Sequence, residues 1–465
     1  MSALLPLRAR AGELLSLVRS FELAAAGSPQ LVVLAGPRRV GKSLLAHHAL
    51  EADHGCRPVY FEATQAGEAA QLRRFRAAVV EALGEAAVPP GPSPQTWEQA
   101  FQLLAYLAAE RPLAVVIDEA TYLMASTPGF ASMVQAVWDT MAVQASPPRL
   151  AIVLTGSALG LVEDALSHRG ALYQRPTLHV NLRPFGHAQA WDFTGRPEPV
   201  ALLEAYAACG GYPLHLDAWD FERPTNDILL DLAGAPGGVL VEDASHLLAG
   251  LTDAHQRVLI AVGLGRSRPS EIATEAGGRV ERPLEALRRA GLVRLCKPLG
   301  APRQARPSYR VDDAYLRFWF RVLANHVQRV EAGQGAAVLR HAEAAWQEQL
   351  GWSFEEAARQ HAAWLAVNGT LPAGALTGEW WTATGPPAQV DVLARHEHRT
   401  VAVGEARWQG RPLGQRAVDE LAAKLRVVPD PVAQPLLLLW GRAGVRPDVQ
   451  VGAVRGFDAG AVLRR

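Results

Sequence analysis

The residues best suited to chemistry lie in a glycine-rich stretch near the start of the chain. Residues 36–43 read GPRRVGKS, which fits the spacing G-x-x-x-x-G-K-[ST]. The glycines let the backbone curl, so that successive N–H groups point inward at an anion. We expect Lys42 to reach the outer phosphates of ATP, and Ser43 to bind Mg²⁺. The predicted nucleotide site comprises Gly36, Pro37, Arg38, Arg39, Val40, Gly41, Lys42, Ser43 and Leu44.

Two elements must position this stretch. An apolar run typical of a buried strand, LVVLA, precedes it, and the helical segment LLAHHALEA follows it. In this order the phosphates meet the positive N-terminal end of a helix. Composition supports the same interpretation over a chance glycine-rich turn. Of 46 basic residues only Lys42, Lys297 and Lys424 are lysine, so a lysine at this position is informative.

A pair of acids follows a second apolar strand. Residues 113–119 read LAVVIDE, the Walker B form, so Asp118 and Glu119 stand where the strand ends. We expect Asp118 to hold magnesium through water, and Glu119 to orient or activate the attacking water.

A third apolar strand, LAIVLTG, ends in polar residues. Thr155 and Ser157 each suit a sensor of the γ-phosphate, and each equally suits a cap on the next helix. Further along, Arg169, Arg175 and Arg183 are candidates for an arginine finger.

Length, charge and cysteine content limit the class of protein. The 465 residues suffice for two to four domains, and 46 basic residues balance 46 acidic ones. This composition excludes a wholly disordered chain and a uniformly basic nucleic-acid coat. The three cysteines have neither CxxC nor zinc-ligand spacing, and no apolar run reaches the length of a membrane span. We therefore expect a cytoplasmic protein without a membrane partner.

Strand–helix alternation from about 30 to 182 predicts a parallel, doubly wound sheet. We expect its strands at 31–36, 58–63, 113–118, 150–155 and 177–182.

Residues 251–310 carry a net charge of +7, with 12 basic and 5 acidic residues. Their pattern of three helices and a hairpin is the layout of a winged helix. Such a domain binds DNA, or serves only to pack domains together. The residues expected to contact DNA are Arg282, Arg288 and Arg289 on the third helix and Lys297, Arg303 and Arg306 on the wing.

The last third of the chain contains a carboxylate pattern. Asp391 lies in the apolar strand QVDVLA, and a second strand brings Glu405 and Arg407. Asp…Glu-x-Lys on a hairpin is the metal site of restriction-endonuclease-like folds. Arginine replaces lysine poorly there, because it is planar and stays protonated. The alternative is a solvated hairpin with scattered acids.

In this order the motifs resemble the archaeal-type P-loop ATPase family, near the AAA-like and signalling (STAND) ATPases. The segments that carry the resemblance are RAGELLSL, GPRRVGKS, VVIDEATYL, LTGSALG, LYQRPTLHVNLRPF, CGGYPLHL, YRVDDAYLRFWFRV, FEEAA, GEWW, QVDVLA and GEARW. The resemblance implies an α/β P-loop NTPase core with a parallel doubly wound sheet at 1–185, a helical lid at 186–250, a winged-helix domain and linker at 251–334, and an α/β restriction-endonuclease-like domain at 335–465.

The resemblance also assigns roles. Arg175 becomes the finger, Pro213 belongs to a lid element beside the nucleotide, and Arg407 takes the lysine position. The implied second magnesium site comprises Glu355, Asp391 and Glu405. Because Gln389 stands where the family has glutamate, and arginine where it has lysine, we expect a nuclease fold that has lost cleavage and binds DNA or protein.

Three functions follow from these patterns. The leading one is an ATP-hydrolysing, DNA-associated switch or motor-like protein that uses ATP and Mg²⁺. The alternatives are an ATP-gated, magnesium-dependent DNA nuclease and a nucleotide-binding scaffold for a protein partner. A finger at Arg175 acts in trans only if protomers meet at the nucleotide, as in a homo-oligomer or a nucleotide-dependent assembly.

Overall fold

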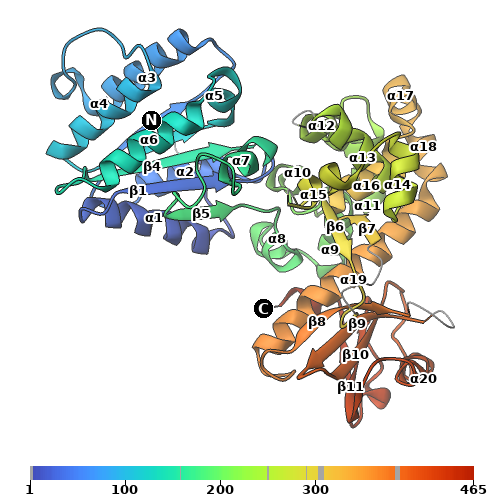
Figure 1. The fold of residues 1–465 in the computed structure, drawn as a ribbon. Coiled ribbons are helices and arrows are strands. Elements are labelled where there is room, and N and C mark those ends of the chain that lie inside the picture. The colour runs from blue at the N-terminus through green and yellow to red at the C-terminus, as the bar shows by residue number, and fades with distance from the viewer. Residues whose placement is uncertain are drawn as a thin grey trace. The chain divides into compact units, whose positions relative to one another are not determined.

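The chain divides into two compact units. The computed structural model describes residues 4–157, 159–248, 251–289, 291–301, 308–382 and 388–464. The first unit extends to Arg183, and the second runs from Pro184 to Leu248 and onward from Thr252. Figure 1 shows the elements of each unit.

A five-stranded parallel sheet forms the centre of the first unit, with strand order β2-β3-β4-β1-β5. Its strands are β1 (Gln30–Ala35), β2 (Arg57–Glu62), β3 (Leu113–Asp118), β4 (Leu150–Gly156) and β5 (Leu178–Asn181). The predicted parallel sheet is confirmed, and each strand lies within two residues of its expected bounds. Every residue of β1, β3 and β4 is buried, as a parallel sheet covered on both faces requires.

Helices cover the two faces of this sheet (Figure 1). They are α1 (Ala11–Ala25), α2 (Lys42–Glu51), α3 (Glu68–Leu83), α4 (Trp97–Glu110), α5 (Thr121–Ser126), α6 (Phe130–Ala142), α7 (Leu159–Leu166) and a short turn at Glu85–Ala87. On one face, Phe75, Trp97 and Phe130 from α3, α4 and α6 meet in edge-to-face contacts within the main apolar core. Helix α1 packs along β1 and β4.

The strand order decides which side chains can meet. Because β4 lies between β1 and β3, residues that follow these three strands gather at the carboxyl edge of the sheet. This edge is where open α/β sheets bind ligands.

The second unit begins with a helical region. Its elements are α8 (His187–Phe193), α9 (Pro199–Cys209), α10 (Pro213–Asp217), α11 (Thr225–Leu229) and α12 (Val239–Leu248), followed further along by α16 (Ala314–Phe318), α17 (Val327–Arg329) and α18 (Gly335–His341), with wide helical turns at Leu230–Gly234, Trp319–Leu323 and Val330–Gln334. The helical region breaks after α9. Gly210 adopts a positive φ of 59°, and Pro213 occupies the first turn of α10.

Three helices and a hairpin occupy the basic segment, in the expected order. They are α13 (Asp253–Gly263), α14 (Pro269–Ala276), α15 (Glu281–Arg289) and the antiparallel strands β6 (Val293–Cys296) and β7 (Ser308–Val311).

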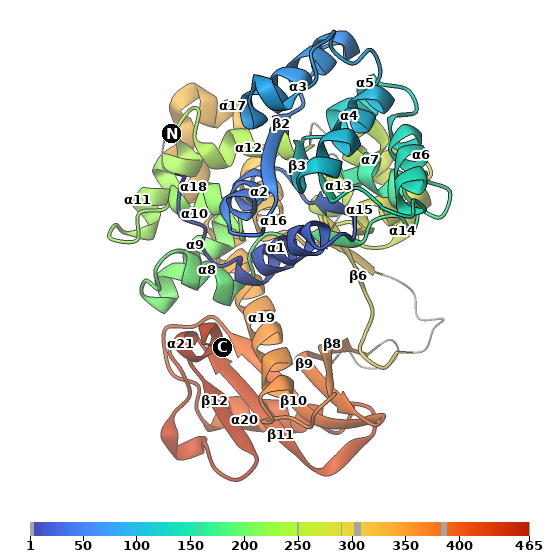
Figure 2. The same cartoon turned by 90° about the vertical axis from the view of Figure 1, so that its left-hand side faces the viewer.

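The chain ends in a mixed five-stranded sheet with order β12-β11-β10-β9-β8. The elements are α19 (Glu343–Val367), β8 (Leu376–Trp381), β9 (Gln389–His396), β10 (Arg399–Arg407), α20 (Gln415–Lys424), β11 (Pro431–Gly441), a turn at Pro447–Val449, β12 (Val454–Phe457) and α21 (Ala459–Leu463). Strands β8, β9 and β10 are antiparallel neighbours, whereas β10, β11 and β12 run parallel. The long helix α19 packs against β8, β9 and β10 (Figure 2).

Among the described residues, no helix is long and apolar enough to cross a membrane.

Candidate nucleotide-binding site

The glycine-rich loop joins β1 to α2 and has the curled backbone that phosphate binding requires. Arg39 and Gly41 adopt positive φ angles of 66° and 92°. A Cβ atom on Gly36 would lie 2.3 Å from the Leu182 carbonyl oxygen, so only glycine fits there. The loop is thus shaped by local conformation and by one close backbone approach.

Lys42 is the first residue of α2 and is buried. Its Nζ donates to the carbonyl oxygens of Gly36 at 3.0 Å and Pro37 at 2.9 Å. Burial lowers the pKa of Lys42, and the nearby charges of Glu119 and Asp118 partly offset this effect. The ammonium group therefore lies within the loop, and the charges of Asp118 and Glu119 act on it, as the sequence predicts for a phosphate-binding lysine.

Asp118 and Glu119 close the carboxyl end of β3. Asp118 is buried, and its Oδ1 accepts hydrogen bonds from the Thr155 hydroxyl and from the Glu119 N–H. Glu119 has a positive φ of 50°, a conformation that is rare for residues other than glycine. Its Oε2 accepts from the Ser157 hydroxyl at 2.7 Å. The turn thus directs two carboxylates to the same edge of the sheet.

The two sensor candidates both bind this acidic pair. Thr155 Oγ1 also accepts from the Glu119 N–H at 2.9 Å, so Thr155 fixes both the Asp118 carboxylate and the turn after it. Ser157 donates to the Glu119 carboxylate. Thr155 is therefore placed to orient the acids, and Ser157 to restrain Glu119.

Tyr60 is a residue of this site that no sequence motif indicates. It lies on β2, next to β3, and its hydroxyl donates to Asp118 Oδ2. Burial, followed by the Asp118 charge, raises the pKa of Tyr60, and the nearby Ser43 side chain partly offsets this rise. Its ring stacks on His47 of α2, with 3.9 Å between ring centroids. A tyrosine in a half-buried strand has no motif spacing that would reveal this role.

The donors at this site suit magnesium. The Tyr60 hydroxyl donates to Asp118 and also interacts with the nearby Ser43 side chain, so the hydroxyl and carboxylate expected to bind the ion converge. Oxygen ligands of this kind are those that Mg²⁺ prefers.

The arginine candidates have different surroundings. Arg175 is half-buried and pairs with Asp139 of α6 at 3.2 Å, while its Nη1 donates to the Tyr173 carbonyl. Arg169 and Arg183 are exposed. Arg175 as a finger stays a prediction, and that role would require its pair with Asp139 to open.

The remaining loop and lid residues are placed as follows. Arg38 donates to the Tyr122 hydroxyl at 3.0 Å, which ties the loop to the turn after the acidic pair. Arg39 is exposed. Pro213 lies in the second unit, whereas the loop lies in the first, so its role beside the nucleotide stays a prediction.

The described DNA candidates lie on the surface of the basic segment. Arg282, Arg288 and Arg289 are exposed on α15, and Lys297 is exposed directly after β6. Arg288 and Arg289 both pair with Glu285, and together they lower the pKa of this carboxyl to about 2. Arg303 and Arg306 lie outside the described residues.

The β6–β7 hairpin is also bound to the C-terminal sheet domain. Arg294 of β6 pairs with Glu356 of α19, which pairs in turn with Arg359 at 2.7 Å. Arg310 of β7 pairs with Glu379 of β8 at 2.8 Å. One side of the hairpin is therefore used for packing within the second unit.

The predicted carboxylates of the C-terminal domain are electrostatic neighbours. Asp391 on β9 lies beside Glu405 on β10, because Gly404 pairs with Val392 one position away. Burial, followed by the charge of Asp391, raises the pKa of Glu355 on α19 to about 8. Burial, followed by the charge of Glu405, raises the pKa of Asp391.

A lysine lies at this cluster, at a position different from the expected one. Lys424, the last residue of α20, places its Nζ 2.5 Å from Glu405 Oε2. Arg407 lies 3.6 Å from Glu405 and pairs more closely with Glu420, at 2.6 Å.

As the side chains stand, the described part of the chain has no group of three or more His, Cys, Asp or Glu residues arranged to hold a metal ion. The second magnesium site at Glu355, Asp391 and Glu405 therefore stays a prediction. Cations occupy part of the cluster, since Glu355 lies 3.8 Å from Arg359.

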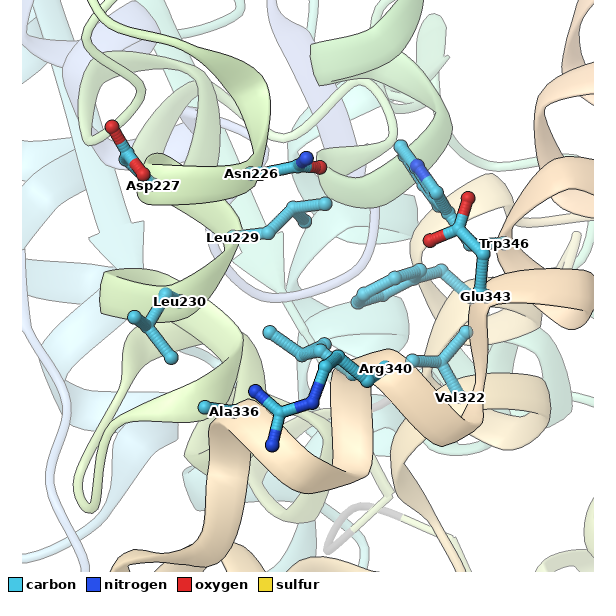
Figure 3. Close-up of a pocket in the computed structure, with 11 residues that line it drawn as sticks. Asn226, Asp227, Leu229, Leu230, Val322, Ala336, Arg340, Glu343 and Trp346 are labelled. Atoms are coloured by element: carbon cyan, nitrogen blue, oxygen red, sulfur yellow. The ribbon is translucent and has the colours of Figure 1, made fainter.

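A separate pocket of about 250 Å³ opens in the helical region of the second unit. Leu229 and Leu230 face it from one side, and Val322 and Arg340 from the other (Figure 3). None of its lining residues was expected to bind nucleotide, metal or DNA.

Comparison with known proteins agrees with the motifs. Residues 10–217 match an ATPase domain predominantly from Archaea, and residues 319–420 match archaeal and bacterial proteins of unknown function. No curated protein is similar enough in sequence to be counted as a relative.

Two solved structures that match parts of the chain are a Walker-type ATPase and an ORC2 protein. A Walker-type ATPase of Pyrococcus abyssi is 20% identical, covering 66% of this chain and 95% of its own, with a TM-score of 0.46. The ORC2 protein of Aeropyrum pernix, in ADPNP–ADP complexes, is 13% identical, covering 74% and 97%, with a TM-score of 0.47.

Proposed function

We propose that ATP turnover at Gly36–Ser43 controls a DNA-associated second unit, since residues 10–217 match an ATPase domain found predominantly in Archaea. The observation that supports this best is the convergence of Lys42, Asp118 and Glu119. Their charges interact at the carboxyl edge of one parallel sheet.

Each residue of the site has a role in this proposal. The loop N–H groups and Lys42 hold the phosphates of ATP. Ser43 and Asp118 hold Mg²⁺, which neutralises charge on the phosphates. Glu119 orients the attacking water, and Ser157 keeps its carboxylate in place before the nucleotide binds.

DNA association is proposed from the basic segment. We take residues 251–334 as a winged-helix domain with its linker, in which α15 presents Arg282, Arg288 and Arg289 to DNA. The hairpin already packs on the C-terminal domain through Arg294, so among its described residues those on the opposite side and Lys297 contribute, and Arg303 and Arg306 stay part of the proposal. The preceding lid at 186–250 and Pro213 belong to the same proposal.

The test is ATP hydrolysis by the full chain with and without duplex DNA, at two salt concentrations. Because phosphate contacts weaken steeply with salt, stimulation by DNA should fall at the higher concentration. Turnover that ignores DNA at both concentrations would contradict DNA control. Nucleotide binding without any turnover would favour the scaffold instead.

A second candidate, an ATP-gated nuclease, is favoured by one specific observation. Lys424 supplies the ammonium group beside Glu405 that Arg407 could not supply. The C-terminal domain would then cut DNA with magnesium at Asp391 and Glu405, with Lys424 positioning the water.

Plasmid nicking by the full chain with Mg²⁺ and ATP tests this second candidate. Asp391→Ala and Lys424→Ala should each abolish nicking, whereas Arg407→Ala should retain most of it. If the wild type leaves the plasmid intact, the C-terminal domain has no cleavage activity.

A further inference from the structure

Tyr60 contacts Asp118, one of the two residues expected to bind magnesium. Its hydroxyl donates to Asp118 Oδ2. The side chain of Ser43, the other expected ligand, is near enough to this hydroxyl to lower its pKa.

The position of the ring is fixed by both neighbouring elements. Tyr60 lies on β2, where it pairs with Val116 two residues before Asp118. On its other side the ring stacks on His47 of α2, at an interplanar angle of 24°. Helix α2 also carries Ser43, so the ring lies between the helix and the strand that supply the ligands.

A phenol in this position opposes a cation. Mg²⁺ requires near-octahedral coordination at about 2.0–2.1 Å from its oxygen ligands. Asp118 is expected to hold the ion through a water ligand, and an Asp118 oxygen that accepts the phenol O–H has a proton where the hydrogen of that water would lie. The hydrogen bond must therefore break, or turn to another acceptor, before Asp118 can face the ion.

We propose that Tyr60 is a latch that competes with magnesium for Asp118 and thereby sets the magnesium concentration at which the nucleotide binds. This inference rests on the proposed function of the same site. In the nucleotide-free protein the latch ties β2, β3 and α2 together. Binding of Mg²⁺-nucleotide displaces the hydroxyl and releases β2 from Asp118.

The latch makes the site selective for the metal–nucleotide complex. A free nucleotide gains nothing from opening the hydrogen bond, because only the cation replaces it at Asp118. A single hydrogen bond to a charged group contributes about 1.5–3 kcal/mol, so its removal should change the magnesium requirement about tenfold or more.

The test measures binding of a fluorescent ADP to the full chain as Mg²⁺ is titrated from EDTA-buffered solution. Tyr60→Phe should bind ADP at about one-tenth of the magnesium concentration that the wild type needs, with ADP binding in EDTA unchanged. Tyr106→Phe is the matched control, since Tyr106 is an exposed tyrosine of the same unit, 58% accessible. It should behave as the wild type.

The outcomes separate the latch from the site itself. An unchanged or increased magnesium requirement in Tyr60→Phe overturns the latch, and an increase would show that the hydroxyl helps to hold the ion. If neither protein binds ADP under any condition, the proposed nucleotide site fails instead.

Thermal unfolding and a second variant keep the test decisive if Tyr60→Phe is poorly folded. Tyr60→Phe should unfold at a lower temperature than the wild type in EDTA. Addition of Mg²⁺-ADP should raise its unfolding temperature by more than it raises that of the wild type. His47→Ala, which removes only the stacking partner, should shift the magnesium requirement in the same direction by a smaller factor. An opposite shift contradicts the latch.

Discussion

Two lysines lie beside carboxylates in this chain, and the two sites are assembled differently. Lys42 belongs to the same eight-residue loop as the glycines that shape its surroundings. Lys424 reaches Glu405 from the end of α20, 19 residues further along the chain. The first site is determined by local spacing, and the second by the packing of a helix on a sheet.

The difference shows which part of a site a motif can report. A motif records residues that must be neighbours in sequence because one turn positions them. It cannot record a side chain that a distant element supplies, even when the chemistry is the same. A lysine in the expected strand position is therefore not required for an ammonium group to lie at the C-terminal carboxylates.

The largest expected effect is a loss of ATP turnover when the site of the first lysine, Lys42, is changed. Lys42→Ala and Glu119→Gln should each lower ATP turnover by at least about 100-fold, because charge stabilisation and water activation are lost. Phosphate release measures this effect. Lys424→Ala is the matched lysine control and should hydrolyse ATP at the wild-type rate, and equal losses in all three variants would contradict the assignment.

The next effect concerns the ion pairs that bind the hairpin to α19. Glu356→Gln leaves Arg294 and Arg359 without their shared carboxylate, so unfolding of the second unit should become easier by about 3 kcal/mol. Chemical denaturation followed by tryptophan fluorescence measures this. Glu348→Gln, at a carboxylate that is 65% exposed and paired with Arg321, should change stability little.

A smaller effect is expected from pH. The pKa of Glu355 rises to about 8 on folding, so between about pH 4.5 and 8 the native protein binds more protons than the unfolded chain. Stability should therefore fall as pH rises through this window. Glu355→Gln should flatten the dependence and be more stable than the wild type at pH 8, by on the order of 1 kcal/mol. An identical pH profile in thermal unfolding would show that this carboxyl is not perturbed.

The smallest expected effect tests whether the basic segment, residues 251–310, contacts DNA. Each of Arg282→Ala, Arg288→Ala and Arg289→Ala should reduce the salt dependence of DNA binding by about one unit of slope, if the residue contacts a phosphate. Fluorescence anisotropy over a salt series measures this slope. A triple variant with an unaltered slope would show that DNA binds at another surface. Arg399→Ala, at an exposed arginine of β10, is the control.

Much of the fold was predictable, for a physical reason. The strands of the first unit are short apolar runs buried on both faces, so β1, β3 and β4 stand out in the sequence. The loop and the acidic pair follow directly on such strands, and their bounds were accordingly predicted within two residues.

The partners across the sheet were not predictable in this way. Tyr60 reaches Asp118 from a neighbouring strand, 58 residues away, and Arg10 reaches the Arg183 carbonyl, 173 residues away. Such contacts depend on strand order, which no local pattern specifies. Lys424 and Glu405 are a third case, in which a helix end supplies the cation.

The close approach between Gly36 and Leu182 has a mechanical consequence. Leu182 donates its N–H to Ala35 at 2.7 Å, and Arg10 joins the next carbonyl, of Arg183, to the loop carbonyl of Val40. The chain thus leaves the first unit through a peptide segment that is clamped to the phosphate loop. Tension applied to the chain at Arg183 would therefore pull on the phosphate loop through these hydrogen bonds, so it should change the affinity of the loop for nucleotide.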